Sequence, residues 1–256
     1  GVSNPVASLV VSGNVLTLTL TNAFTAGTVN LAYVDPTSGD DALAIQDLAG
    51  NDALSVIQGT VADGYVRGAQ IYIDSNANGI ADASEKLDGV VTDANGNFFL
   101  PDTAPEGPII AVGGVNIDTG VPNTVPLKAP AGATTVNPLT TLVQAVIEAA
   151  PAGTTVTVQA ASDSVSQSLG LTLPQGVSLA NYDPLSATDA NVLLAQKAAA
   201  QIATILTLAA SAPATGTTAT QAVTTVANAL VTQVTAAVTN TTTVNLSDPN
   251  TVDNLF

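Results

Sequence analysis

Residues 74–85 read Asp-Ser-Asn-Ala-Asn-Gly-Ile-Ala-Asp-Ala-Ser-Glu, and they are the most informative stretch of the chain. Glycine stands at the position where such a loop must bend sharply. The spacing matches the calcium-loop pattern D-x-(D/N)-x-(D/N)-G-x5-E at every defined position. Ca²⁺ takes about six to eight oxygen ligands, and this spacing supplies them from one short turn. The predicted ligands are the side chains of Asp74, Asn76, Asn78, Asp82 and Glu85 and the backbone carbonyl of Ile80.

The segments on either side of this loop are of β type. Gly68–Ile73 alternates apolar residues before the loop, and Gly89–Thr92 follows it. Asn95 and Gly96 form a strong turn signal because both residues tolerate a positive φ. A calcium loop between strands, rather than between amphipathic helices, indicates a structural ion and no calcium-driven helix opening. The alternative interpretation is a solvated Asn/Asp/Gly turn that binds nothing.

The composition excludes several classes of site. The chain has 256 residues, with four Lys and Arg against 20 Asp and Glu, a formal net charge of −16, and no Cys, His, Met or Trp. An acidic surface repels phosphate backbones, so we expect no nucleic-acid partner. Without Cys and His, the usual zinc site and a thiol redox centre cannot form.

Catalysis is not expected either. Glutamate occurs only at Glu85, Glu106 and Glu148, and the first of these belongs to the calcium loop. Paired-carboxylate hydrolysis needs two acids across a cleft, and a Ser–His arrangement needs a histidine. The chain also lacks a glycine-rich nucleotide-binding pattern and a nucleophile-elbow pattern. We therefore expect a non-catalytic protein.

Small and hydroxyl-bearing residues dominate the chain, as they do in secreted bacterial surface proteins. No segment has the pattern of a signal peptide, and none is a long uninterrupted apolar span. We therefore expect an internal or processed start and an extracellular chain that does not span a membrane.

Pattern divides the chain into four segments and predicts a mixed β and α, multidomain fold. Residues 1–60 are predicted to form a partial β-domain, 61–130 the β-module with the calcium loop, 131–240 a helical bundle, and 241–256 an extended C-terminal tail. Strands are expected at 6–11, 15–20, 28–34, 69–73, 89–92, 97–100 and 109–117. Helices are expected from the Asn137-Pro138 start to Pro151 and over 162–169, 189–211 and 218–239.

Three stretches carry a resemblance to known families. Residues 63–74, the loop itself and Thr92–Phe98 resemble the calcium-binding B-type repeats of Gram-positive surface proteins, which are Ig-like sandwiches related to collagen-adhesin B modules. Residues 33–54 resemble the tail of an Ig-like repeat in very large bacterial surface and swimming-motility proteins. The tract with Asn181–Pro184 and Gln196–Ala203 resembles helical regions that accompany such modules in giant adhesins. The resemblance implies Ig-like sandwiches followed by a small helical bundle, outside a bacterial cell.

Residues 1–60 depart from this family because they supply only three or four strands, whereas an Ig-like sandwich needs about seven. One explanation is a boundary placed inside a domain. The other is completion by a strand from a neighbouring copy, for which Thr241–Leu246 has strand character. We therefore expect a structural protein that assembles with itself into a filament or surface layer. The alternative is a stalk or ligand-binding module of a large adhesin, with an unknown surface glycan or protein as ligand.

A second acidic cluster precedes the calcium-loop module. Its spacing is irregular, so a second calcium at the junction and a solvated loop both stay open. The cluster consists of Asp35, Asp40, Asp41, Asp47, Asn51 and Asp52. Asp93, Asn95 and Asn97 are interpreted as turn residues rather than as another metal loop.

Overall fold

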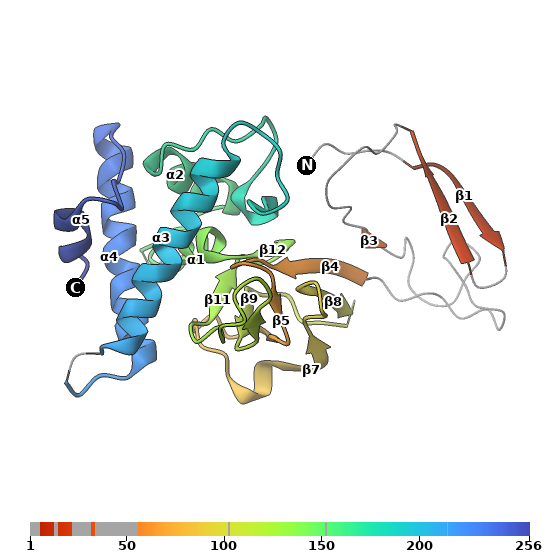
Figure 1. Cartoon of the computed structure of the whole chain (residues 1–256), viewed down its shortest axis with the longest axis horizontal. Helices are drawn as coiled ribbons and strands as arrows, with labels where there is room; N and C mark the ends of the chain where they lie inside the picture. The colour runs from red at the N-terminus through yellow and green to blue at the C-terminus, as the bar shows by residue number, and fades with distance from the viewer. Residues whose placement is uncertain are drawn as a thin grey trace.

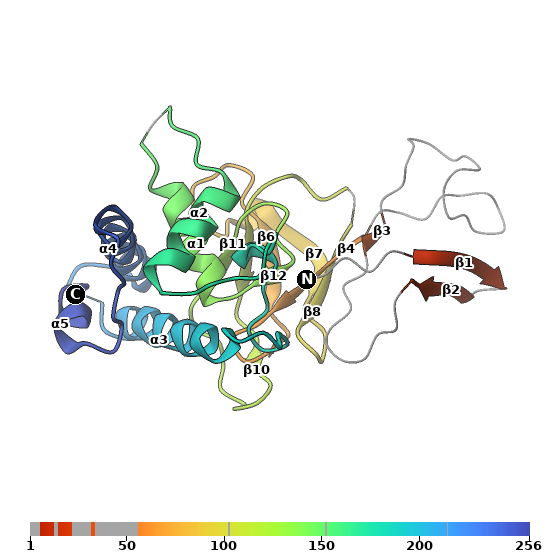
Figure 2. The same cartoon turned by 90° about the horizontal axis from the view of Figure 1, so that it is seen from above.

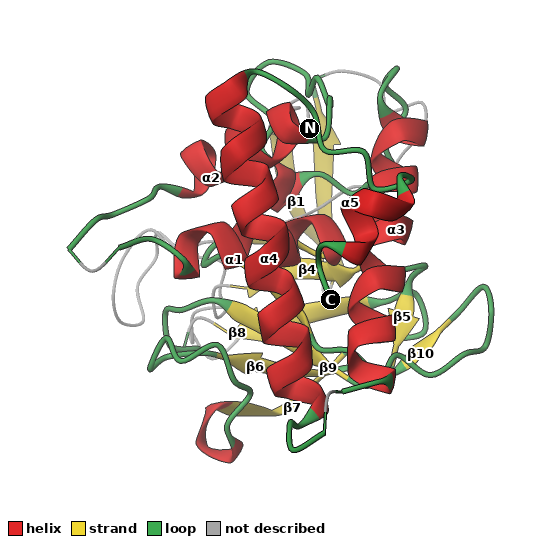
Figure 3. Ribbon diagram, turned by 90° about the vertical axis from the view of Figure 1, so that its left-hand side faces the viewer, coloured by secondary structure: helices red, strands yellow, loops and turns green. Residues whose placement is uncertain are grey.

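The structure is a computed structural model that describes residues 6–12, 15–21, 32–33, 56–101, 103–151, 153–213 and 215–256. Short strands fill the middle of the chain, and helices follow from residue 138 onward. Figure 3 shows the helices gathered on one side of the strands. The fold is therefore mixed β and α, as the sequence predicts, with several sheets and five α-helices in the described part.

The first sheet carries the predicted calcium loop. It consists of β6 (Gln70–Ile73), β7 (Lys86–Val91), β9 (Ile109–Val112) and β11 (Leu127–Ala129). The strand order is β11-β9-β6-β7, and all neighbours are antiparallel. The buried residues on β6 alternate with partly buried ones, as expected for a strand with one face in a core.

The second sheet is centred on β4 (Val56–Val61). β8 (Asn97–Pro101) pairs antiparallel along one edge of β4. The opposite edge is shared by β3 (Ala32–Tyr33), which is antiparallel, and β12 (Thr135–Val136), which is parallel. A separate ribbon pairs β5 (Val66–Arg67) with β10 (Val115–Asn116). The expected strands at 69–73, 89–92, 97–100 and 109–117 are thus confirmed, the last as two shorter strands.

Both sheets contribute to one buried cluster. Its largest side chain is that of Phe98, which is 1% exposed. Gly59 on the neighbouring strand leaves room for this ring, because a Cβ there would lie 2.2 Å from Phe98 Cζ. The other large members of the cluster are Val61, Val66, Ile71, Ile73, Leu100, Ile109, Leu127 and Val136.

The predicted N-terminal hairpin is also confirmed. β1 (Val6–Ser12) and β2 (Val15–Leu20) pair antiparallel. Figures 1 and 2 place this hairpin at the end of the molecule away from the helices. Val6, Leu9 and Val10 are about half exposed, at 48%, 49% and 57%. Of the strand expected at 28–34, β3 is the described part.

The helices start largely where the sequence predicts. α1 (Pro138–Glu148) is capped by Asn137, with proline in its first turn. α4 (Ala219–Asn240) is capped by Thr218, whose hydroxyl accepts from the Gln221 backbone N–H. α2 (Val158–Ser168) begins earlier than expected, at a Thr157 cap.

Helix α3 (Val192–Ser211) begins later than the expected start at Asp189. Asp189 instead accepts the backbone N–H of Asn191 and the hydroxyl of Tyr182. Because these bonds hold the carboxylate outside the helix, α3 begins three residues later than the pattern indicated.

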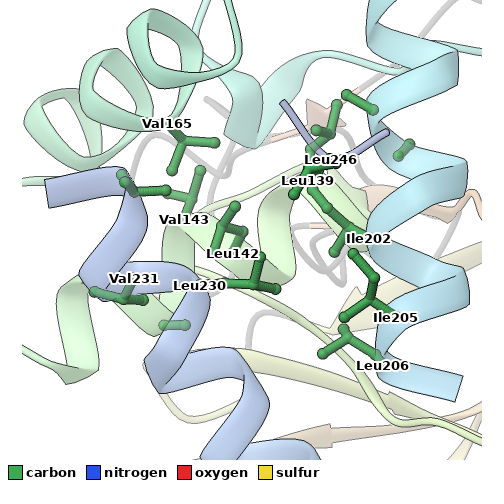
Figure 4. Close-up of a cluster of buried hydrophobic side chains, with 14 of the residues drawn as sticks. Leu139, Leu142, Val143, Val165, Ile202, Ile205, Leu206, Leu230, Val231 and Leu246 are labelled. Atoms are coloured by element: carbon green, nitrogen blue, oxygen red, sulfur yellow. The ribbon is translucent and has the colours of Figure 1, made fainter. Parts of the chain in front are cut away.

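The four long helices enclose a second buried cluster, drawn in Figure 4. Valine, leucine, isoleucine and alanine at helical spacing supply it, as in a small bundle. The labelled members are Leu139, Leu142, Val143, Val165, Ile202, Ile205, Leu206, Leu230, Val231 and Leu246. This confirms that the apolar stripes of the sequence face a core.

Two of these helices are also long and apolar enough to cross a membrane by length and composition. They are α3, with 20 residues, and α4, with 22. Core helices of other proteins pass the same test. Both supply side chains to the buried cluster between the helices, including Ile202 and Leu230, and this burial accounts for part of their apolar character.

The C-terminal segment 241–256 is not an extended tail. It contains the short helix α5 (Pro249–Asp253), and residues 241–247 form no strand. The Val244 N–H donates to the Ser168 carbonyl at 2.7 Å, and Leu246 and Leu255 are 7% and 3% exposed. Of the apolar residues that favour a strand here, Leu246 is buried against the helices of the same chain and Val244 is partly buried against them.

The β-module and the helices are joined by residues 178–183, which we call the 178–183 interface. Leu179 and Tyr182 belong to the helical cluster, whereas Ala180 between them belongs to the β cluster. The Thr134 N–H donates to the Ala180 carbonyl at 3.1 Å, and the Tyr65 hydroxyl donates to Asp183 Oδ2 at 2.9 Å. The two cores therefore interlock across this segment.

Candidate metal site

The loop 74–85 connects β6 to β7, so the prediction of a loop between strands is confirmed. The Asp74 N–H donates to the Pro108 carbonyl at 2.9 Å, which fixes the start of the loop to the neighbouring chain segment. The short 3₁₀ turn η1 (Ala83–Glu85) ends the loop and leads directly into β7. Both ends of the loop are thus held by the first sheet.

Asp74 organises the first half of the loop. Its side chain is buried, at 1% exposure, and both of its oxygens accept backbone N–H groups. Oδ1 accepts from Asn78 at 3.0 Å, and Oδ2 accepts from Gly79 at 2.8 Å. The chain reaches this arrangement through positive φ angles at Ala77 (56°) and Gly79 (74°). A positive φ at alanine is strained, and such strain is concentrated at functional sites.

Glu85 organises the second half. It is 5% exposed, and its Oε1 accepts from the Asn76 N–H at 3.1 Å and from the Ser75 hydroxyl at 3.3 Å. Its Oε2 accepts from the Asp82 N–H at 3.4 Å. The first and last residues of the loop therefore both direct their carboxylates at backbone groups within it.

The amide side chains of Asn76 and Asn78 bond to the third carboxylate of the loop, that of Asp82. Asn76 Nδ2 and Asn78 Nδ2 donate to Asp82 Oδ2 at 3.1 and 2.8 Å. The Asn76 and Asn78 amide oxygens accept the N–H groups of Asn78 and Ile80. The Ile80 carbonyl accepts from the Asp82 N–H at 3.1 Å. All six predicted ligand residues are thus connected within one hydrogen-bond network.

Charge in the loop is unbalanced. Asp74, Asp82 and Glu85 are acidic, and none of them forms an ion pair within the described part of the chain. Lys86, the next residue, pairs instead with Asp88 at 3.1 Å on the surface. Buried carboxylates are normally paired or bound to a metal, because burial of an isolated charge is costly.

The residues fit a calcium ion in donor type and number. In the described residues no three carboxylates lie close enough to form an acidic cluster, so amide and carbonyl oxygens would have to complete the shell. Asn76, Asn78 and Ile80 supply such oxygens from the same turn. The two amides would need to turn their oxygens toward the ion, which exchanges the positions of their oxygen and nitrogen atoms.

Outside the loop, Lys128 and Glu148 lie against Gly79. A Cβ added to Gly79 would stand 2.7 Å from Lys128 Nζ and 3.4 Å from Glu148 Oε2. Lys128 pairs with Glu148 at 3.1 Å. Sequence reasoning missed this pair, because no local pattern indicates that β11 and the end of α1 meet the loop.

The other candidates give a simpler outcome. Asp93 Oδ1 accepts the backbone N–H groups of Asn95 and Asn97, both at 2.8 Å, as the interpretation of these residues as a turn requires. The second acidic cluster at residues 35–52 lies outside the described residues.

Comparison with protein-family models, with curated proteins and with solved structures found no match for this chain. The interpretation of the loop therefore depends on its own residues and geometry.

Proposed function

We propose that residues 74–85 bind Ca²⁺ as a structural ion in a non-catalytic module of a bacterial surface protein. The observation that supports this most directly is the burial of Asp74 and Glu85 without a cationic partner in the described part of the chain. A bound divalent cation would neutralise these carboxylates where no Lys or Arg does so.

The donor set favours calcium over magnesium. Mg²⁺ keeps several waters and uses only one or two carboxylates, whereas Ca²⁺ accepts a flexible shell of carboxylate, amide and carbonyl oxygens. Held between β6 and β7, the ion would stabilise the turn that joins two strands of the first sheet. Its role would be structural, since the loop is flanked by no pair of mobile helices.

A location outside the bacterial cell is supported by the composition and by the resemblance to surface-protein repeats. Of the two roles considered, we favour self-assembly into a filament or surface layer over a passive stalk. The apolar residues exposed on the β1–β2 hairpin, Val6, Leu9 and Val10, are the feature that another copy could cover.

The calcium proposal is tested by calorimetric titration and thermal unfolding of the full chain. Ca²⁺ at 100 times its dissociation constant should add about 2.7 kcal/mol of stability. For a chain of this size, that corresponds to a rise in Tm of roughly 5–10 °C. D74N and E85Q should abolish both the binding heat and the rise in Tm. D88N, which removes an exposed carboxylate outside the loop, should retain both.

A wild-type chain that shows no binding heat and the same Tm with calcium and with EGTA would refute the proposal. The assembly role is tested separately, by size-exclusion chromatography with light scattering in calcium and in EGTA. A chain that stays monomeric at high concentration in both conditions would favour the stalk over the filament or layer.

A further inference from the structure

The pair Lys128–Glu148 connects the calcium loop to helix α1. Lys128 is only 19% exposed and Glu148 31% exposed at their side chains, and both lie against the bare Cα of Gly79. Gly79 also donates its N–H to buried Asp74. Gly79 therefore contacts the buried carboxylate of Asp74 through its backbone N–H, and it contacts the Lys128–Glu148 ion pair at its Cα.

Lys128 is bound to α1 at both ends of that helix. Its carbonyl accepts the Thr140 hydroxyl at 2.7 Å, and its N–H donates to the Thr141 hydroxyl at 2.9 Å, in the first turn of α1. Its ammonium group reaches Glu148 in the last turn, where Gln144 Nε2 also donates to Glu148 at 3.1 Å. Lys128 thus contacts both the first and the last turn of α1.

Helix α1 is in turn part of the core of the helical bundle. Leu139 and Val143 are fully buried there, and α1 packs against α2, α3 and α4. A change in the order of the loop would therefore reach the bundle through Gly79, the ion pair and α1, a continuous chain of contacts.

We propose that calcium in the loop stabilises the helical bundle as well as the β-module, and that the Lys128–Glu148 pair transmits this effect. The inference rests on the proposed calcium site. Without the ion, the buried carboxylates of Asp74 and Glu85 have no cationic partner, and they attract the nearby Lys128 ammonium. With the ion bound, the loop is ordered and Gly79 is fixed against the Lys128–Glu148 pair. The Lys128 ammonium then pairs with Glu148 alone. The last turn of α1 then opens less often.

Hydrogen exchange of the full chain, with calcium and with EGTA, tests this coupling. In the wild type, calcium should slow amide exchange in the loop and also in the peptide that covers residues 145–150, the latter by about 5-fold or more. K128M and E148Q should retain calcium binding to within a few-fold, measured by calorimetry, but lose the protection at 145–150. K86M, which breaks the exposed Lys86–Asp88 pair beside the loop, serves as the matched control and should keep it.

The outcomes are distinct. Absence of calcium binding in the wild type would remove the proposed function and this inference together. Calcium binding that protects the loop and the first sheet but not residues 145–150 would leave the function intact and overturn the coupling. Protection at 145–150 that persists in both K128M and E148Q would show that the ion pair does not transmit it. If K128M fails to fold, E148Q alone tests whether the ion pair transmits the effect, because glutamine keeps the shape of the Glu148 side chain.

Discussion

The β-module and the helices that follow it meet at two interfaces with different chemistry. The 178–183 interface is built from buried apolar residues and from hydrogen bonds such as that between Asn137 and Tyr182. The second, which we call the loop interface, consists of the loop 74–85, Lys128 and Glu148, and it is held by charge at a partly exposed site. Buried neutral hydrogen bonds respond little to salt, whereas exposed charge pairs are screened.

This difference suggests a division of roles. The 178–183 interface would hold the two modules together under all conditions. The loop interface would add stability only when the ion is bound. Substitutions that remove groups from the first interface should therefore show no effect of calcium or salt.

The largest effect is expected for N137A. Asn137 is fully buried, caps α1 by accepting the Thr140 N–H at 2.8 Å, and donates to the Tyr182 carbonyl at 3.3 Å. Loss of the cap costs about 1–2 kcal/mol. The unpaired carbonyl costs about 1–3 kcal/mol more. We expect a Tm lower by roughly 10 °C, at low and at high salt, in thermal unfolding.

N137S is the matched control for this prediction, because serine keeps the helix cap and loses only the donor to Tyr182. It should recover about half of the lost stability. If N137S were as stable as the wild type, the bond to Tyr182 would contribute nothing, and the comparison between the two interfaces would lose its main support.

The sequence predicts the place of the loop between two strands but not the residues that pack against it, for a physical reason. The predicted ligands of residues 74–85 are contiguous, so their spacing alone indicates a candidate site, and the flanking residues indicate the strands on either side. The contact of Lys128 and Glu148 with Gly79 depends on the packing of β11, α1 and β6, and no local pattern contains it. The same holds for Tyr65 and Asp183, whose bond joins segments far apart in the chain.

The C-terminal segment shows the converse error, a local pattern that tertiary packing overrides. Thr241–Leu246 has strand propensity, and it was expected to extend from the molecule and pair with another copy. Leu246 instead enters the buried cluster between the helices, and the Val244 N–H bonds to the end of α2. Strand propensity depends on context, and a nearby apolar surface of the same chain decides the outcome. The starts of α1 and α4 were predicted correctly because caps are local.

An intermediate effect is expected for Y65F. The Tyr65 hydroxyl donates to Asp183 Oδ2 at 2.9 Å across the 178–183 interface. A hydrogen bond to a charged acceptor contributes about 1.5–3 kcal/mol when buried, and somewhat less at this partly buried site. We expect a loss of about 1–2 kcal/mol in chemical denaturation, the same with calcium and with EGTA. Y72F is the control, since no hydrogen bond of its hydroxyl is found within the described residues. A calcium-dependent loss in Y65F would contradict the separation of the two interfaces.

The smallest effect, and the only one that depends on pH, is expected for D63N near the same interface. Burial raises the pKa of the Asp63 carboxyl above its ordinary value of 3.8. Below that ordinary value the group is protonated in the folded and the unfolded chain, so its charge costs the fold nothing. Above that ordinary value the unfolded chain releases the proton more readily than the folded chain does, which favours unfolding. The stability that is present at low pH is therefore lost as the pH rises through the folded-state pKa of Asp63. Asn cannot ionise, so D63N should raise the Tm at about pH 7, by no more than about 2 °C, and should match the wild type at about pH 3.

D118N, which removes an exposed carboxyl, should show no such pH-dependent difference from the wild type. A gain in D63N that is equally large at both pH values would show that turn conformation, and not the buried charge of Asp63, sets the difference.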